Sequence, residues 1–328
     1  MFELRAAAAR QYIDSVAVFE AHEESLVEAA QVRGGMYWHK GPPSAPEASY
    51  LVRTTAAGAE TSLGPRSADN EEIYRRFIDR KRASEQRLAG LKASLHDHRR
   101  LNRALRVGRV SPLIVDILNR LAASRLGEHF RVVGTHALYA YEAAASITFD
   151  ADAVATRDID LLWDTRKRVQ FATRLAKIDS SMLGVLKKVD TTFRIRNSKK
   201  YIAVNKDGFE VDIIRREAVD GDPHLNPPTQ RLSGDEGDFW VAQAPKAHLL
   251  LDAAPFSAVI VASNGDMARM NTLHPLAFSK FKRWMAQQPD REPAKRGRDA
   301  LQARLVEEAV QRYLPQWAVR DIPPTSQG

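Results

Sequence analysis

The sequence predicts an α+β fold in which a mixed sheet is packed against flanking helices. Short segments rich in β-branched and aromatic residues indicate strands, and longer segments with apolar residues at helical spacing indicate helices. The two kinds of segment alternate without an internal repeat. This order is typical of a central sheet whose faces are covered by helices.

Three parts are expected along the chain. Residues 1–105 form a helical N-terminal module with a small β element, because helical spacing covers Phe2–Gln31 and about Asn70–Leu105, with glycines, prolines and short apolar runs between them. Residues 106–220 form the core, and residues 221–328 form a mainly helical C-terminal module that begins with strands.

The core is expected to contain strands near Val132, Ile159, Phe193 and Val211 and helices at Ser111–Leu126, His136–Ala145 and Arg166–Ile178. The C-terminal module is expected to contain strands Trp240–Ala244 and Ala258–Ala262 and helices Pro275–Gln287 and Lys295–Tyr313.

Two carboxylates in the apolar stretch Asp158–Trp163 are the most informative feature. Asp158 and Asp160 are two residues apart, so on a strand they project from the same face. Paired hard oxygen ligands can hold Mg²⁺ or Mn²⁺ and leave coordination positions for phosphate. An acidic pair alone is also compatible with a solvated strand end.

A turn upstream has the features of a phosphate site. Gly134 and Thr135 follow the expected strand and precede a helix. Glycine lets the backbone approach a ligand, threonine can cap the helix or donate its hydroxyl, and the first-turn N–H groups favour an anion. The alternative is an ordinary helix cap.

A third carboxylate, Asp212, lies in the apolar run Phe209–Ile214. An acidic group in such a strand is costly unless it is paired, hydrogen-bonded or bound to metal. Together, Asp158, Asp160 and Asp212 predict an acidic site on neighbouring strands.

This order of parts resembles the DNA polymerase β-like nucleotidyltransferase superfamily. The segments Val133–Glu142, Ala155–Trp163 and Asp290–Ala303 are similar to a bacterial branch of nucleotidyltransferase-fold proteins of unknown function. A more distant similarity is to the nucleotidyltransferases of abortive-infection and toxin–antitoxin systems. The resemblance covers about Arg106 to Leu314.

The resemblance implies roles for these residues. Asp158, Asp160 and Asp212 would be catalytic and would hold two Mg²⁺ or Mn²⁺ ions, with Asp212 also helping to deprotonate the attacking hydroxyl. Gly134 and Thr135 would bind the β and γ phosphates of an NTP. One departure is the long step from the glycine turn to the acidic pair, which predicts an added loop or hairpin at about Ser146–Thr156.

Cations on the last helices are further nucleotide-binding candidates. In related folds, helices behind the sheet supply cations to the triphosphate, which favours Lys280 first and then Lys295 and Arg298. The alternative is that Arg298 pairs with Asp299 and only docks the helix.

Composition bounds the class of protein. The 328 residues include no cysteine, which excludes disulfides and thiolate metal sites. The N-terminus lacks the apolar core of a signal peptide, and no run approaches membrane-spanning length, so a cytoplasmic enzyme without a membrane partner is expected. The net charge of +8 is compatible with a polyanionic partner.

Basic residues cluster on the expected helix from Asn70 to Leu105 and continue to Arg109. Arg99, Arg100 and Arg103 are the candidates for nucleic-acid contact, and a solvated face is the alternative. The β element before this helix carries aromatic and basic residues that can either stack on nucleic acid or form a small core, namely Tyr37, Trp38, Lys40, Tyr50, Arg53 and Arg66.

The predicted activity is metal-dependent transfer of an NMP from an NTP to a hydroxyl, with an RNA end such as that of a tRNA as the leading acceptor. A protein or small-molecule acceptor is the next possibility. A catalytically silent nucleic-acid-binding or antitoxin-like protein is the alternative of another class, and the retention of Asp212 argues against it. A metal-dependent glycosyltransferase would leave Gly134, Thr135 and Asp212 unexplained. The NTP, the acceptor and the oligomeric state are not encoded in any recognisable motif.

Overall fold

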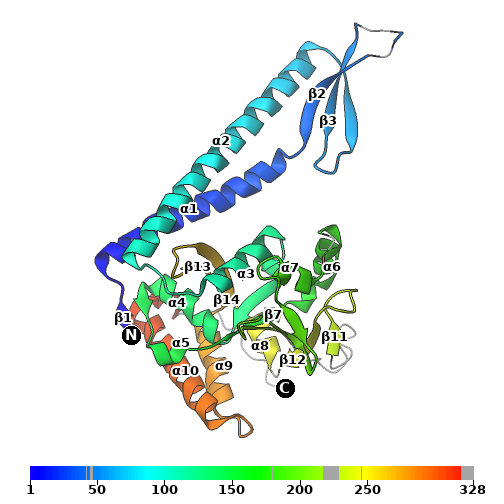
Figure 1. Cartoon of the computed structure of the whole chain (residues 1–328). Helices are drawn as coiled ribbons and strands as arrows, with labels where there is room; N and C mark the ends of the chain where they lie inside the picture. Colours follow the sequence, from blue (N-terminus) through cyan, green and yellow to red (C-terminus); the bar gives the residue numbers. More distant parts are fainter. Residues whose placement is uncertain (42, 45–46, 179, 217–228, 245, 319–328) are drawn as a thin grey trace. The chain divides into compact units, whose positions relative to one another are not determined.

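The computed structural model describes residues 1–41, 43–44, 47–178, 180–216, 229–244 and 246–318 (Figure 1). The chain divides into two compact units, one formed by Met1–Ala9 with Asn102–Gly328 and the other by Arg10–Leu101. The boundary expected after residue 220 lies outside the described residues.

Two long helices and a small sheet build the unit Arg10–Leu101. Helix α1 (Ala6–Gln31) and helix α2 (Ala68–Leu105) enclose the antiparallel sheet of β2 (Gly35–Lys40), β3 (Ser49–Thr54) and β4 (Glu60–Pro65). The helices are tied by polar contacts: Gln11 Nε2 and His98 Nδ1 are 2.9 Å apart, and Arg87 pairs with Glu28 at 2.8 Å.

Trp38 packs the small sheet against α2. Its ring lies 5.9 Å from that of Tyr74, and the guanidinium of Arg66 lies 5.4 Å from the Trp38 ring. Tyr37 instead is exposed and donates a hydrogen bond to Glu60. Trp38 and Arg66 thus belong to a small local core, which favours that alternative for this pair of residues.

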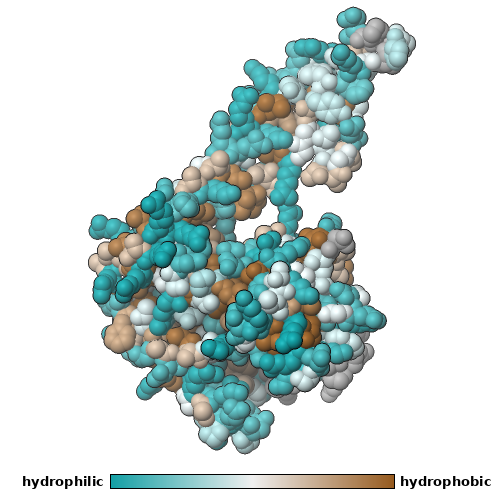
Figure 2. Space-filling view, viewed as in Figure 1, coloured by the Kyte–Doolittle hydropathy of each residue, from teal (hydrophilic) through white to brown (hydrophobic). Residues whose placement is uncertain are grey.

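The surface of α2 is mostly polar. The only side chain of α2 that is buried is Asn102, in the described part of the helix, and hydrophilic residues dominate its visible face (Figure 2). Arg75 and Arg76 both pair with Glu72, so part of the basic charge is neutralised locally. Arg99, Arg100 and Arg103 are exposed on the same helix.

A seven-stranded mixed sheet forms the centre of the other unit. Its strands run in the order β11-β12-β10-β7-β5, and β9 pairs with both β10 and β8. β7 and β10 are parallel neighbours, whereas β5 is antiparallel to β7. The strand bounds are β5 Phe130–Val133, β7 Asp158–Trp163, β8 Arg194–Arg196, β9 Lys199–Val204, β10 Glu210–Arg216, β11 Thr229–Arg231 and β12 Trp240–Ala244.

Alternation along the two central strands separates core from site. Ile159, Leu161, Val211 and Ile213 are completely buried and project from one face of β7 and β10. The acidic residues between them therefore project from the opposite face. Strand register and apolar burial together decide where the carboxylates lie.

Helices and a hairpin pack around this sheet, in the mixed α+β arrangement that the sequence predicts. The hairpin of β13 (Pro255–Val261) and β14 (Met267–Leu273) is bound to it by Thr272 Oγ1, which donates to Val132 O at 2.6 Å, and by Tyr141 Oη, which donates to Leu273 O at 3.0 Å. The flanking helices are α3 Pro112–Ala123, α4 Leu138–Ala145, α5 Ala151–Val154, α6 Arg168–Lys177, α7 Met182–Lys187, α8 Ala247–Asp252, α9 Pro275–Ala286 and α10 Pro293–Tyr313.

The expected insertion forms two short elements. β6 (Ile147–Thr148) pairs with β1 (Phe2–Glu3), and α5 contacts α10. The helix expected from Phe2 accordingly begins only at Ala6, since the first residues are used as a strand. The insertion thus ties the N-terminus of the chain to the core.

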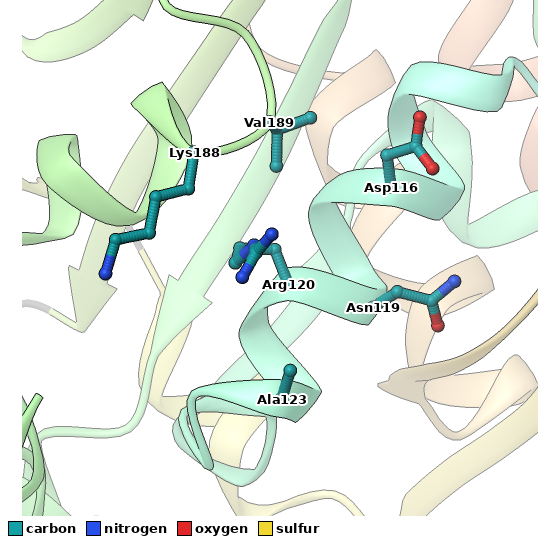
Figure 3. A pocket seen from close by; sticks show the side chains of 6 residues that line it. All are labelled: Asp116, Asn119, Arg120, Ala123, Lys188 and Val189. Atoms are coloured by element: carbon teal, nitrogen blue, oxygen red, sulfur yellow. The ribbon is translucent and has the colours of Figure 1, made fainter.

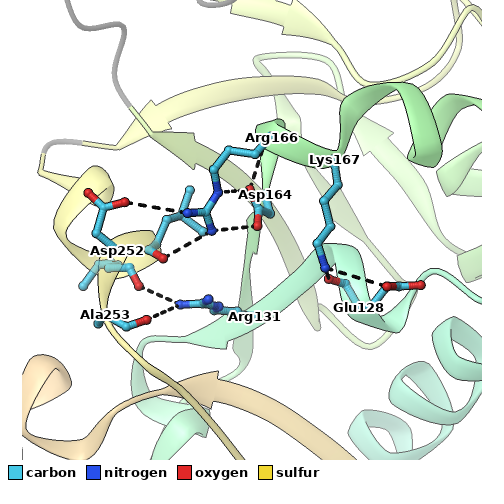
Figure 4. Close-up of polar contacts among 9 residues, drawn as sticks. Glu128, Arg131, Asp164, Arg166, Lys167, Asp252 and Ala253 are labelled. Carbon is cyan, nitrogen blue, oxygen red and sulfur yellow. Dashed lines mark hydrogen bonds and ion pairs between the residues drawn. The ribbon is translucent and has the colours of Figure 1, made fainter. Parts of the chain in front are cut away.

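The far end of β7 is closed by a polar network (Figure 4). Asp164, directly after β7, pairs with Arg166 at 2.8 Å, and Arg131 donates to Leu250 O at 3.0 Å and to Ala253 O at 3.1 Å. Burial opposes ionisation of Asp164, but the hydrogen bonds from Arg166 outweigh it and hold its pKa below the ordinary value. This end of the strand is electrostatically satisfied.

Candidate active site

The acidic site is built by the register of β7 and β10. Asp158 lies opposite Glu210, and Asp160 lies opposite Asp212. Neighbouring strands are about 4.8 Å apart, so the four carboxylates share a small area of one sheet face. The structure therefore brings the three predicted acids together and adds Glu210, which pairs with Arg196.

Gly134 lies directly against Asp160. Val133, the last residue of β5, is opposite Asp160, and Gly134 then turns the chain with a φ of +69°. A Cβ atom at Gly134 would be 2.1 Å from Asp160 Oδ2. Glycine is required both for the backbone angle and for the close approach of the carboxylate.

Thr135 is held from behind by α10. It is buried in the short 3₁₀ helix η2 (Thr135–Ala137), and Gly134 takes the cap position before it. Gln302 Nε2 donates to Thr135 Oγ1 at 3.1 Å and to Ala153 O at 2.7 Å. One buried side chain thus fixes both the glycine turn and the insertion.

Two of the acids are held in an unfavourable electrostatic environment. Burial, reinforced by the charge of Asp158, raises the pKa of Asp160 to about 7. Burial, reinforced by Asp160 and Asp158, raises the pKa of Asp212 to about 7 as well. Asp212 Oδ1 is buried and has no hydrogen-bond partner among the described residues. The contrast with Asp164, on the same strand, is the absence of a directly bonded cation.

Cations from the last two helices face this site at a distance. Lys282, Arg291 and Arg298 each favour the ionised form of Asp160. Lys282 Nζ lies 2.8 Å from Asp299 Oδ1, and Arg291 pairs with the other oxygen of that buried carboxylate. Both cations therefore act on Asp160 through space.

The three predicted nucleotide-binding cations are placed differently. Arg298 bonds to Ala155 O at 3.0 Å and not to Asp299, while its Nε is buried without a partner among the described residues. Lys280 is exposed on α9, and Lys295 pairs with Glu292 at 3.2 Å. Only Arg298 of these three is coupled to Asp160.

Sequence reasoning missed Lys282 and Arg291. One usable signal was spacing: Lys282 follows the apolar Phe278 by one helical turn and shares its buried face. A lysine on the apolar face of a helix needs an acidic partner, and Asp299 supplies it.

The residues that a metal would need do not yet form a closed ligand set. In the described part of the chain, no three His, Asp or Glu side chains converge as a group that could hold an ion. Mutual repulsion accounts for this, because like-charged carboxylates at close range raise one another's pKa and separate. Closing such a site on a cation requires these acids to draw together.

A separate cavity of about 440 Å³ lies between α3 and the residues after α7 (Figure 3). Asn119, at its rim, donates to Met267 O at 2.9 Å. The acids of β7 and β10 do not contribute to its lining, which consists of Asp116, Asn119, Arg120, Ala123, Lys188 and Val189. This cavity is not part of the acidic site.

Comparison with known proteins identifies the family. A protein-family model described as Nucleotidyltransferase matches residues 113–322, a span that contains Gly134, the acidic strands and α10. The chain belongs to this nucleotidyltransferase family. Searches of curated proteins and of solved structures gave no match. As a family member, the chain is a transferase of the nucleotidyltransferase type, and an NTP is its substrate. None of the described helices is long and apolar enough to cross a membrane.

The raised pKa values predict how the stability of this nucleotidyltransferase depends on pH. The ordinary pKa of aspartate is 3.8, against about 7 for Asp160 and Asp212 in the fold. Their protonation therefore stabilises the fold fully below about pH 4, and this contribution is lost as the pH rises through about 7. Without divalent metal, the melting temperature should fall by a few degrees between about pH 6 and pH 8, and Asp160→Asn or Asp212→Asn should flatten that fall.

Asp164→Asn is the matched control, because the pKa of Asp164 is lowered and does not change charge in this range. Thermal melts in chelator at several pH values measure the effect. Equal slopes for wild type and both site variants would contradict the electrostatic account.

Proposed function

We propose that this nucleotidyltransferase moves an NMP from an NTP to a hydroxyl acceptor at the face that carries Asp158, Asp160 and Asp212. The observation that carries the proposal is the register that sets Asp160 beside Asp212 and against Gly134. This arrangement is in accord with the resemblance to the polymerase β-like superfamily.

The residues present fit two divalent metal ions. Carboxylate oxygens are the ligands that Mg²⁺ and Mn²⁺ prefer, and Asp158, Asp160 and Asp212 would hold them. The fit rests on the buried, unpartnered Asp212 Oδ1 and on the raised pKa values, which mark a site short of positive charge. When bound, such ions lower the pKa of an attacking hydroxyl and neutralise the developing charge on the leaving pyrophosphate.

The remaining roles belong to the chain itself. The backbone of Gly134 lies open to a phosphate because no side chain intervenes, and Thr135 follows it with its hydroxyl oriented by Gln302. Arg298 supplies a positive charge beside Asp160, and Lys280 and Lys295 stay weaker candidates for phosphate contact. Asp212 can accept the proton of the acceptor hydroxyl, since its pKa of about 7 suits a base near neutral pH.

A catalytically silent binding protein is a poorer explanation of these acids. Keeping Asp160 and Asp212 charged in a buried site destabilises the fold at neutral pH. A protein without need of metal would gain stability by replacing them, which favours an enzyme.

The acids should be needed for chemistry and not for folding. Replacing Asp158 or Asp160 by Asn removes ligand charge, so transfer should fall on the order of 10³-fold while the melting temperature is kept or raised. The assay is incorporation of label from each NTP, with Mg²⁺ or Mn²⁺, into total RNA or protein. Asp164→Asn controls for a change of charge on the same strand, and near-normal transfer by the site variants would refute the metal assignment.

For the acceptor we propose an RNA end, bound in part by α2. Its Arg and Lys side chains would displace counterions, so affinity should fall with salt at a log–log slope of about −0.7 per phosphate contacted on a single strand. Replacing Arg99 and Arg100 by Ala should flatten the slope and leave NTP binding unchanged.

The control is the double replacement of Arg75 and Arg76 by Ala, because Glu72 already neutralises that pair. Titration of labelled RNA at several salt concentrations measures both slopes. Absence of RNA binding at low salt, or equal slopes for the two variants, would favour a protein or small-molecule acceptor.

A further inference from the structure

Three aromatic rings form a column beside the acidic face. His136, in η2, lies 5.7 Å from Tyr139 with the ring planes 19° apart, and 6.4 Å from Phe209 at 28°. Centroid distances and angles of this kind are those of offset stacking. The three residues come from two distant segments of the chain, so the column is a product of the fold.

One end of the column is closed. The guanidinium of Arg109 lies 5.9 Å from the centroid of the Tyr139 ring. Arg109 is itself held by Glu142 and by Phe149 O, to which it donates at 2.7 Å. A planar ligand cannot be added at this end without displacing a buried ion pair.

The other end ends in Phe209 and meets the acidic site. Phe209 directly precedes Glu210, the residue opposite Asp158. Its backbone is fixed by Asn205, whose Oδ1 accepts from Phe209 N at 2.8 Å. Phe209 remains partly exposed, and in the described part of the chain His136 is its only aromatic neighbour.

The middle ring points independently to a polar ligand. His136 is 4% exposed, and neither of its ring nitrogens has a hydrogen-bond partner among the described residues. Burial lowers its pKa to about 4, against the attraction of Asp158, so the ring is neutral at physiological pH. A buried imidazole with both nitrogens unsatisfied is costly and calls for a partner that arrives with a ligand.

We propose that the Phe209 end of this column is the subsite for the nucleobase of the NTP. The inference rests on the proposed function, because the triphosphate has to lie at the neighbouring carboxylates. A base stacked on Phe209 extends the column by one ring and brings its polar edge, or that of its ribose, toward the unsatisfied nitrogens of His136. Stacking accepts every base, so the subsite holds the nucleoside without reading its identity.

The test separates base binding from phosphate binding. Phe209→Leu keeps an apolar side chain but removes the ring, so affinity for each NTP with Mg²⁺ should fall roughly 10-fold to 100-fold. Affinity for inorganic triphosphate with Mg²⁺ should be unchanged, and Phe209→Trp should retain NTP binding. Phe281→Leu is the matched control, because Phe281 is also a partly buried ring in a stacked pair, with Trp284.

Calorimetric titration of the full chain gives all of these affinities. If Phe209→Leu binds NTP as wild type does, or loses NTP and triphosphate equally, the base subsite is overturned while the proposed function stands. If the wild-type chain binds neither NTP nor triphosphate, both are overturned together.

Discussion

The carboxylate of Asp160 lies against the backbone of Gly134 and beside that of Asp212, and much of the surrounding structure can be understood as a response to this placement. Two acids with a pKa of about 7 are held where burial disfavours their charge. Folding alone gives no reason for such a cost. A site that receives cations does, because a bound cation repays the cost of desolvation and repulsion.

Helix α10 links the parts that this site needs. Arg298 bonds to the insertion at Ala155, Asp299 holds Lys282 and Arg291 near the acids, and Gln302 bonds to both Thr135 and Ala153. Arg298 and Gln302 are one helical turn apart and so share a face. One helix therefore sets the positions of the glycine turn, the insertion and the nearby positive charge.

Much of the site could be predicted from residue types and spacing. Alternation on β7 and β10 places Asp158, Asp160 and Asp212 on one face, and an acid in an apolar strand is informative by itself. The long helices, strand β12 and the interruption between Gly134 and Asp158 were also predictable from local pattern. Expectations failed in detail where tertiary pairing decides: Phe2–Glu3 is a strand because β6 is its partner.

The electrostatic surroundings could not be predicted in this way. Lys280 and Lys295 are as basic as Lys282, and only the packing of α9 on α10 makes Lys282 the one that faces Asp299 and Asp160. The role of His136 likewise depends on Phe209, which lies more than seventy positions away in the sequence. Side-chain contacts between distant segments carry this information, and no local pattern contains it.

The central claim is that the acids of β7 and β10 exist to hold divalent ions with a nucleotide. Diffraction from crystals grown with Mn²⁺ and a non-hydrolysable NTP analogue tests it most directly, because anomalous scattering locates manganese without reference to the chain. The account predicts two manganese ions bound by Asp158 and Asp160, one of them also by Asp212, with the triphosphate against Gly134. A nucleotide bound elsewhere, or bound here with no manganese at these carboxylates, would contradict it.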